Sequence, residues 1–134
     1  KGIFENWRSR MSEGDPKDSD QVVKIVLFDT DGKILVLKNE SWGPDLPGGH
    51  IMVGEDLRDG LKREVEEETG LQIKDFSKLN YESKNKTFYY GTVPSKKIAL
   101  SSEHDGYDFL TLEGVLESDM KESFKDAVKE AAGE

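Results

Sequence analysis

The alternation of hydrophobic and polar positions predicts several β-strands along this chain. The run QVVKIVLF, residues 21–28, is rich in β-branched residues and predicts a strand. After the turn sequence DTDG, residues 33–39 (KILVLKN) predict the returning strand of a hairpin. The segment ESWGPDLPGG, residues 40–49, is rich in proline and glycine and predicts a loop. Further strands are predicted at residues 71–76 (LQIKDF), 86–93 (KTFYYGTV) and 107–112 (YDFLTL).

Two segments show the apolar spacing of amphipathic helices. In residues 55–69, Leu57, Leu61 and Val65 lie four residues apart, and Gly70 stands where a helix commonly ends in a left-handed residue. The second predicted helix covers residues 118–134, with Ser118 or Asp119 as its N-cap. Its inward face is predicted to consist of Met120, Phe124, Ala127, Val128 and Ala131.

The order of these elements predicts one α+β domain at residues 21–134. Strands and helices do not alternate regularly, which favours a mixed β-sheet with helices packed on it. A length of 134 residues fits a single domain. Residues 1–20 are polar, contain EGDPKDSD, and are predicted to form an N-terminal arm or linker. Because the chain begins at Lys1 rather than at methionine, it is compatible with a processed product or a piece of a longer protein.

Composition narrows the class of partner. The chain has a formal net charge of −9, with 35% charged residues, which argues against non-specific binding to nucleic acid or anionic membranes. It contains no cysteine, which excludes disulfides and thiolate metal sites. No apolar run approaches membrane-spanning length. We therefore expect a soluble, cytoplasmic protein with a small-molecule partner, and the sequence does not predict its oligomeric state.

Negative charge is concentrated on the first predicted helix and just before it. Five glutamates fall within residues 55–68, where their repulsion lowers stability unless a cation holds the carboxylates together. We take Leu61 as the centre of the apolar face of this helix. At about 100° per residue, Glu68 then lies about 20° from the centre, Glu64 about 60° and Glu67 about 120°, all on one flank.

Three carboxylates on one flank of a helix predict a divalent-cation site. A salt-bridged surface helix would place Lys or Arg at these spacings, but Lys62 and Arg63 are predicted to lie on other faces. Glu66 points elsewhere and is expected to be solvated. Hard oxygen ligands from one helix suit Mg²⁺ or Mn²⁺, with water and phosphate oxygens completing the coordination. The preceding PGGH, residues 47–50, can turn a carbonyl or amides towards a ligand, although an ordinary tight loop explains those residues taken alone.

The same segment resembles a known family motif. GHIMVGEDLRDGLKREVEEETGL, residues 49–71, is similar to the Nudix box, G-x5-E-x7-R-E-U-x-E-E-x-G-U with U aliphatic. The defined positions fit without a gap and are Gly49, Glu55, Arg63, Glu64, Val65, Glu67, Glu68, Gly70 and Leu71. Met52 stands where many members carry an acidic residue, which leaves the metal-binding core of the box unchanged. The resemblance implies the Nudix α/β/α sandwich, with which the predicted order of elements agrees.

The resemblance also implies hydrolysis of a nucleoside diphosphate linked to another moiety. Water would attack one phosphorus of a pyrophosphate with the help of Mg²⁺ or Mn²⁺. The implied metal ligands are Glu64, Glu67, Glu68 and the backbone carbonyl of Gly48. Arg63 and Glu55 would orient those carboxylates.

A further acidic residue is expected outside the box. Nudix proteins often carry a glutamate on a downstream loop, as a metal ligand or general base, and Glu103 in SSEHDGYDF is the candidate. A solvated loop glutamate explains Glu103 equally well, and His104 and Glu113 are the alternatives for the base.

Aromatic residues outside the box bear on the substrate. Tyr89 and Tyr90 loosely match the tyrosine of dinucleoside-polyphosphate hydrolases, although a strand also carries aromatics for its core. Trp42 is a second candidate for stacking on a nucleobase. These residues favour dinucleoside polyphosphates or nucleoside triphosphates as substrates. Two other functions stay open: a non-catalytic module that senses a nucleotide, against which the intact box glutamates argue, and an appended domain of a larger protein.

Overall fold

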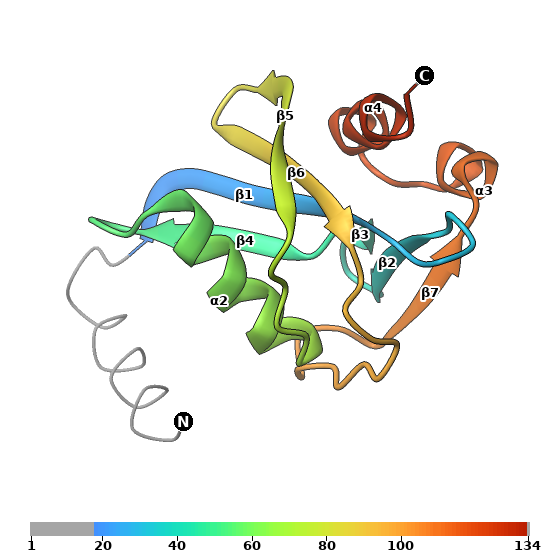
Figure 1. The fold of residues 1–134 in the computed structure, drawn as a ribbon, viewed down its shortest axis with the longest axis horizontal. Helices are drawn as coiled ribbons and strands as arrows, with labels where there is room; N and C mark the ends of the chain where they lie inside the picture. The colour runs from blue at the N-terminus through green and yellow to red at the C-terminus, as the bar shows by residue number, and fades with distance from the viewer. Residues whose placement is uncertain (1–17, 134) are drawn as a thin grey trace.

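The structure, a computed structural model, describes residues 18–133, and its strands form one mixed sheet (Figure 1). The strands are β1 (Asp18–Phe28), β2 (Ile34–Asn39), β3 (Gly43–Asp45), β4 (Gly48–Met52), β5 (Phe76–Ser83), β6 (Lys86–Thr92) and β7 (Gly106–Leu110). The helices are α2 (Leu57–Thr69), α3 (Leu112–Glu117) and α4 (Glu122–Ala131). Of the arm predicted at residues 1–20, residues 1–17 lie outside the described residues, whereas residues 18–20 belong to β1, so the sheet begins three residues before the predicted domain boundary.

The strand β1 is the centre of the sheet. The strand order is β3-β2-β1-β6-β5, with β4 paired to β1 and β7 paired to β2. Strands β1 and β6 run parallel, with Val22 opposite Lys86 and Phe28 opposite Thr92. The other pairs are antiparallel, and β4 lies along the first part of β1 with Lys24 opposite Gly48.

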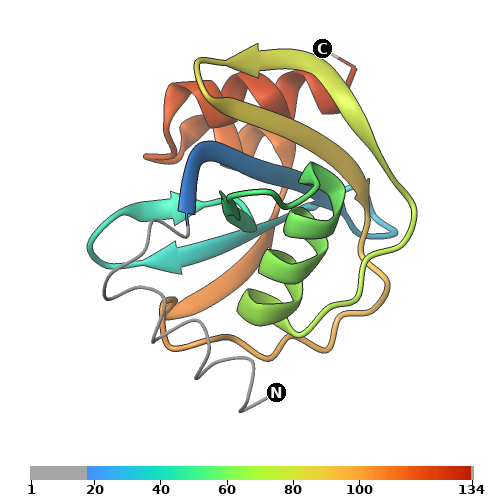
Figure 2. The ribbon, with the colours of Figure 1, turned by 90° about the vertical axis from the view of Figure 1, so that its left-hand side faces the viewer.

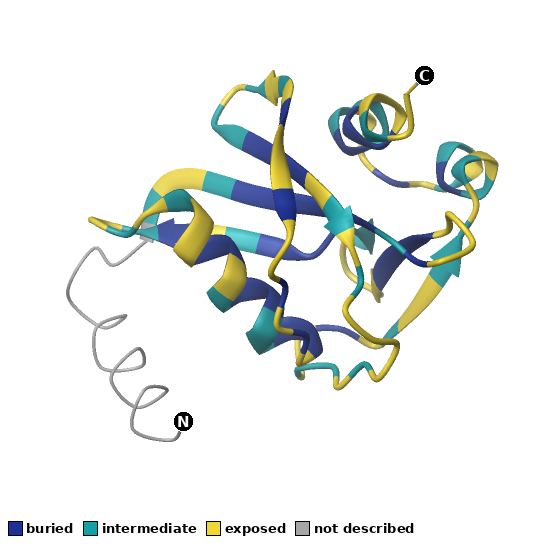
Figure 3. Ribbon diagram, in the orientation of Figure 1, coloured by how far each residue is buried: buried dark blue, intermediate teal, exposed yellow. Residues whose placement is uncertain are grey.

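Helices cover both faces of the sheet (Figures 1 and 2). Side chains of a strand alternate between its faces, and Val23, Ile25 and Leu27 of β1 pack in one core cluster with Leu61 and Val65 of α2. The other cluster contains Val26 of β1 together with Val115 of α3 and with Met120, Phe124, Ala127 and Val128 in and before α4. Figure 3 shows the buried segments gathered between the helices and the sheet. The predicted mixed sheet with helices packed on it is therefore confirmed.

The helix that carries the box glutamates forms nearly as predicted. It begins at Leu57, two residues later than expected, because the Asp56 carboxylate caps its N-terminus by accepting hydrogen bonds from the amides of Arg58 (3.0 Å) and Asp59 (3.3 Å). It ends at Gly70, which has the predicted left-handed conformation with φ 77°.

Two predictions are wrong, one of a strand and one of a loop. Residues 71–76 are irregular up to Phe76, because Leu71 and Ile73 fill the core beneath α2 without a partner strand. The strand in this region is β5, which starts at Phe76 and pairs with β6. The segment predicted as a loop at residues 40–49 contains β3 and the start of β4, which pair with β2 and β1.

The C-terminal part of the chain also differs from the prediction. The strand predicted at residues 107–112 ends at Leu110, and the short helix α3, capped by Thr111, follows it. Ser118 does not cap α4, because its hydroxyl donates to the carbonyl of Val115 (2.6 Å) at the end of α3. The cap residue of α4 is Lys121. Among residues 18–133, no helix is long and apolar enough to cross a membrane.

Candidate functional site

The packing of α2 decides where its glutamates point. Leu61 and Val65 are fully buried against the sheet, so the side chains next to them on the helix surface lie at the edge of the core. Glu64 and Glu68 are accordingly buried, at 8% and 5% exposure. Glu66 lies on another side of the helix, where its carboxylate accepts a hydrogen bond from Gln72 Nε2 (3.2 Å).

Arg63 connects several of the acidic residues. Its Nε and Nη2 donate to the two oxygens of Glu55, at 2.8 and 2.9 Å, and its Nη1 donates to Glu64 Oε2 at 2.9 Å. The same Nη1 lies 3.6 Å from Glu67 Oε1. Arg63 was predicted to lie on another face of the helix, but its long side chain reaches Glu64 and Glu67. Bidentate pairing with Glu55 fixes the guanidinium, which is the arrangement that an orienting role requires.

Two glycines at the start of β4 let it pass close to both β1 and α2. Gly48 has a φ of 133°, and a Cβ there would lie 2.0 Å from the carbonyl oxygen of Val23. Its amide donates to Glu68 Oε1 at 2.9 Å. At Gly49, a Cβ would lie 2.6 Å from Glu64 Oε1. Glycine is thus required at residue 48 by the close approach of the β1 backbone, and at residue 49 by the close approach of the Glu64 carboxylate.

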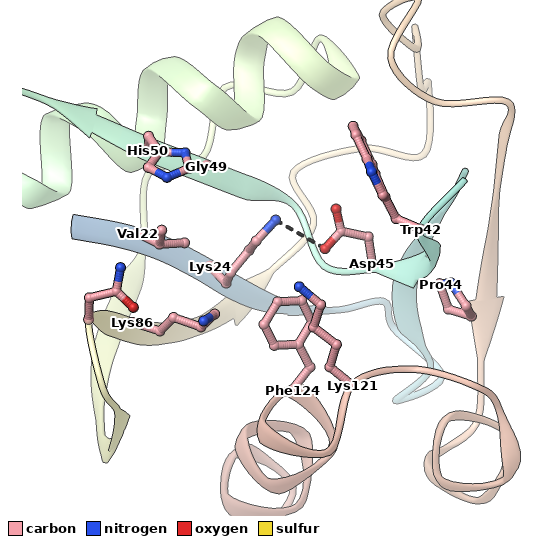
Figure 4. A pocket seen from close by; sticks show the side chains of 11 residues that line it. Val22, Lys24, Trp42, Pro44, Asp45, Gly49, His50, Lys86, Lys121 and Phe124 are labelled. Carbon is pink, nitrogen blue, oxygen red and sulfur yellow. Dashed lines mark hydrogen bonds and ion pairs between the residues drawn. The ribbon is translucent and has the colours of Figure 1, made fainter. Parts of the chain in front are cut away.

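The buried cation of the site is Lys24, which was not among the predicted site residues. From the middle of β1, its ammonium donates to Asp45 Oδ1 (3.0 Å) and to the carbonyls of Leu46 (3.0 Å) and Gly48 (3.2 Å). Figure 4 shows the ion pair with Asp45. The sequence does contain a signal for this role, because Lys24 lies inside the apolar run QVVKIVLF. A lysine buried with such a strand needs acceptors for its charge.

The loop before β7 is attached to the end of α2. The amide of Ala99 donates to the carbonyl of Thr69 (2.8 Å), and the amide of Ser101 donates to that of Glu68 (3.1 Å). This brings Glu103 and the buried His104 towards the carboxylates of α2. His104 Nε2 lies 3.6 Å from Asp45 Oδ2, whereas Glu113 lies in α3 and does not line this region.

These elements enclose a cavity of about 210 Å³. Its acidic walls are formed by Glu64, Glu68, Glu103 and Asp45, and Gly48, Gly49, Lys24, His50, His104 and Trp42 complete the lining. The structure therefore brings together five of the sequence-predicted residues, namely Gly48, Glu64, Glu68, Glu103 and Trp42. It does not place Glu67 in this lining, and Tyr89 is buried against Phe76 in the core. Tyr90 is exposed but does not line the cavity either.

The cavity carries excess negative charge. Burial, followed by the neighbouring charges of Glu64 and Asp45, raises the pKa of Glu68 to about 8, although Lys24 and the amide of Gly48 act in the opposite direction. Burial also acts to raise the pKa of Asp45, but His104 and Lys24 outweigh it and hold that pKa below its usual value. One carboxyl group is therefore kept protonated at neutral pH in the absence of a further cation.

The donor set suits a hard divalent cation. Carboxylates and a backbone carbonyl are the ligands that Mg²⁺ and Mn²⁺ prefer, and, among the described residues, Glu64, Glu68, Glu103 and Asp45 line the cavity against the single ammonium of Lys24. Within residues 18–133, no three acidic or histidine side chains are grouped closely enough to hold an ion as they stand. Glu64 is held by Arg63, and Glu68 by the amide of Gly48, so these side chains would have to turn towards an ion.

Comparison with known proteins agrees with this geometry. A family model described as the NUDIX domain matches residues 18–131. The chain is similar to a solved MutT protein from Methanosarcina mazei Go1, with 26% identity, a TM-score of 0.63, and coverage of 86% of this chain and 96% of that one. No curated protein matches the chain.

Two further solved structures show the same fold. An Ap4A hydrolase from C. elegans has 21% identity and a TM-score of 0.66, with 84% of this chain and 95% of that chain covered. The dihydroneopterin triphosphate pyrophosphohydrolase of E. coli has 14% identity and a TM-score of 0.71, with 88% and 99% covered. Because the family model extends from β1 to the end of α4, the chain belongs to the NUDIX domain family and is a Nudix hydrolase acting on phosphorus-containing anhydrides.

Proposed function

We propose that the chain is a divalent-metal-dependent pyrophosphohydrolase that cleaves a nucleoside diphosphate linked to another moiety. The observation that carries the proposal is the single cavity that Glu64, Glu68, Glu103 and Gly48 line together. Two proteins of similar fold are named as an Ap4A hydrolase and a dihydroneopterin triphosphate pyrophosphohydrolase, which supports a substrate with linked phosphate groups. Dinucleoside polyphosphates and nucleoside triphosphates are the favoured substrates, and such substrates would agree with a cytoplasmic location.

Mg²⁺ or Mn²⁺ would be held by Glu64, Glu67, Glu68, Glu103 and the carbonyl of Gly48. Such an ion supplies neutralisation of the phosphate charges and a lower pKa for the attacking water. The protein holds these ligands beside the cavity before an ion binds: Arg63, fixed by Glu55, holds the Glu64 carboxylate, which would turn from Arg63 towards the ion. The amide of Gly48 does the same for Glu68.

The reaction is a displacement at phosphorus. The water oxygen forms a bond to one phosphorus, the bridging P–O bond breaks, and the second phosphate leaves as an anion. Glu103 accepts the proton of the attacking water, because it lies on the loop that borders the cavity and is exposed to solvent. The exposed ring of Trp42 stacks on the nucleobase.

The proposal is tested by following phosphate-containing products from a panel of dinucleoside polyphosphates, nucleoside triphosphates and nucleotide sugars. We expect hydrolysis with Mn²⁺ or Mg²⁺ and none in excess chelator. Full turnover in chelator would reject the metal-dependent mechanism. Tight binding of nucleotides without hydrolysis of any of them would indicate a sensing module instead.

A further inference from the structure

A second pocket adjoins the acidic cavity. It has a volume of about 340 Å³ and shares Lys24, Trp42, Asp45, Gly49 and His50 with the cavity. Beyond Lys24 its walls include Lys86, the first residue of β6, and Lys121 and Phe124 at the start of α4 (Figure 4). A substrate bound in the cavity can therefore extend across Lys24 into this pocket.

The charge of the second pocket is opposite to that of the cavity. Among the described residues that line it, Asp45 is the only acidic one, and Asp45 is already paired with Lys24 at 3.0 Å. Within residues 18–133, neither Lys86 nor Lys121 forms an ion pair with a carboxylate. The pocket therefore presents two uncompensated positive charges in a chain whose net charge is −9.

Aromatic surfaces lie beside these charges. The ammonium groups of Lys24 and Lys121 lie 5.5 and 5.4 Å from the centroid of the buried Phe124 ring. Trp42, 64% exposed, stands where the pocket meets the cavity. Phe124 is buried and serves to place the two ammonium groups, whereas the exposed ring of Trp42 is open to a base, so the pocket suits a ligand that carries both phosphate groups and a base.

We propose that Lys86 and Lys121 bind phosphate groups outside the scissile pyrophosphate, so that the enzyme selects nucleotides with three or more linked phosphates over nucleotides with two. This inference rests on the proposed function, because the acidic cavity takes the pyrophosphate that is cleaved. A chain of two phosphates would then be used up at the acidic cavity. Only a longer chain brings further negative charge to the two lysines.

The first experiment compares two substrates that carry the same two adenosines and differ only in the number of phosphates between them. Values of kcat/KM for diadenosine tetraphosphate and diadenosine diphosphate are measured with the wild type, Lys86→Gln, Lys121→Gln, the double variant and Lys129→Gln. Lys129 is the matched control, since it lies on α4 outside the pocket. We expect the wild type to prefer the tetraphosphate, and each pocket substitution to lower that preference roughly tenfold, as for loss of a charge-assisted hydrogen bond. An unchanged preference in the double variant would overturn the inference while leaving the hydrolase function intact.

The second experiment does not depend on turnover. Binding of inorganic tripolyphosphate is measured by calorimetry in EDTA, where the acidic cavity repels the anion. The double variant should bind at least tenfold more weakly than the wild type and Lys129→Gln, and the wild-type affinity should fall with added salt. Equal binding by the double variant and the wild type rejects the anion site. Lysine-dependent binding in a protein that hydrolyses no nucleotide supports the anion site and rejects the proposed function.

Discussion

Individual glutamates of α2 have different surroundings although they are chemically alike. Glu68 lines the cavity and accepts the amide of Gly48, Glu67 lies beside Arg63, and Glu66 pairs with Gln72. We expect Glu67→Gln and Glu68→Gln each to lower kcat about 10²–10³-fold, because each removes a charged group that acts in the transition state while preserving its shape. The measurement is kcat at saturating Mn²⁺. Glu66→Gln is the matched control and should change kcat little. Equal damage from Glu66→Gln would contradict the assignment of helix faces.

The raised pKa of Glu68 makes the stability of the metal-free protein depend on pH. In the unfolded chain Glu68 ionises near its ordinary pKa of 4.5, whereas in the folded protein burial raises that pKa to about 8. The folded state therefore holds the proton more tightly, and this group lowers stability progressively as pH rises from 4.5 to 8.

The substitution Glu68→Gln removes this ionisation and keeps an oxygen for the amide of Gly48. In EDTA its Tm should exceed that of the wild type at pH 8, and the difference should disappear near pH 4. Thermal melts across this range provide the measurement. A lower Tm for Glu68→Gln at pH 8 would show that the carboxylate stabilises the metal-free fold.

At the scale of single residues, the sequence pointed to the acidic residues but not to the side chains and backbone groups that contact them in space. Gly48, Glu64, Glu68 and Glu103 line one cavity, Glu67 does not, and the metal-binding role predicted for these residues stays a prediction. Lys24 was missed because nothing local to β1 shows that the turn at residues 45–48 passes over its side chain. Such contacts depend on how β1 and β4 pair, which the hydrophobic pattern of one segment does not contain.

Among the elements, the regularity of the apolar pattern decided what could be predicted. The helix α2 was predicted because Leu57, Leu61 and Val65 form an uninterrupted stripe. The strand β5 was missed because its pairing with β6 shifts register between Lys78 and Glu82, which breaks the two-residue alternation of a strand. In residues 71–76 the alternation of Leu71 and Ile73 resembled a strand, but it reflects two side chains buried under a helix.

The close passage of β4 beside α2 leads to a prediction about Gly49. A Cβ at Gly49 would meet the carboxylate of Glu64 at 2.6 Å, and the far end of that side chain can move aside. We therefore expect Gly49→Ala to lower kcat severalfold or more, while the Tm changes by only a few degrees. Activity assays and thermal melts of the same samples provide the two measurements.

Two other glycines provide the controls for Gly49→Ala. Gly106, where an added Cβ meets nothing within 4 Å, is the matched control, and Gly106→Ala should leave both quantities nearly unchanged. Gly48→Ala should instead destabilise the fold strongly, because its Cβ would lie 2.0 Å from a backbone oxygen. A large loss of Tm in Gly49→Ala would mean that the backbone, rather than the Glu64 side chain, gives way.

Over the whole molecule, the site concentrates negative charge in a chain that is already acidic. The net charge of the chain is −9, and four of its carboxylates line one cavity. Such a cluster lowers the stability of the compact state through repulsion. A cation that binds only the folded protein relieves this repulsion and shifts the unfolding equilibrium by mass action.

Metal binding should therefore stabilise the folded protein, and more so at alkaline pH. At pH 6 the Glu68 carboxyl of the metal-free protein is protonated, since its pKa is raised to about 8, and a metal ion must displace that proton to use the group as a ligand. At pH 8.5 most of the Glu68 carboxyl is already ionised, so a fixed millimolar concentration of Mn²⁺ should raise the Tm more at pH 8.5 than at pH 6. Glu66→Gln should retain this pH dependence and Glu68→Gln should lose it. A Tm increase that is the same at both pH values in the wild type would remove Glu68 from the metal site, and with it the physical reason to expect an alkaline optimum for hydrolysis.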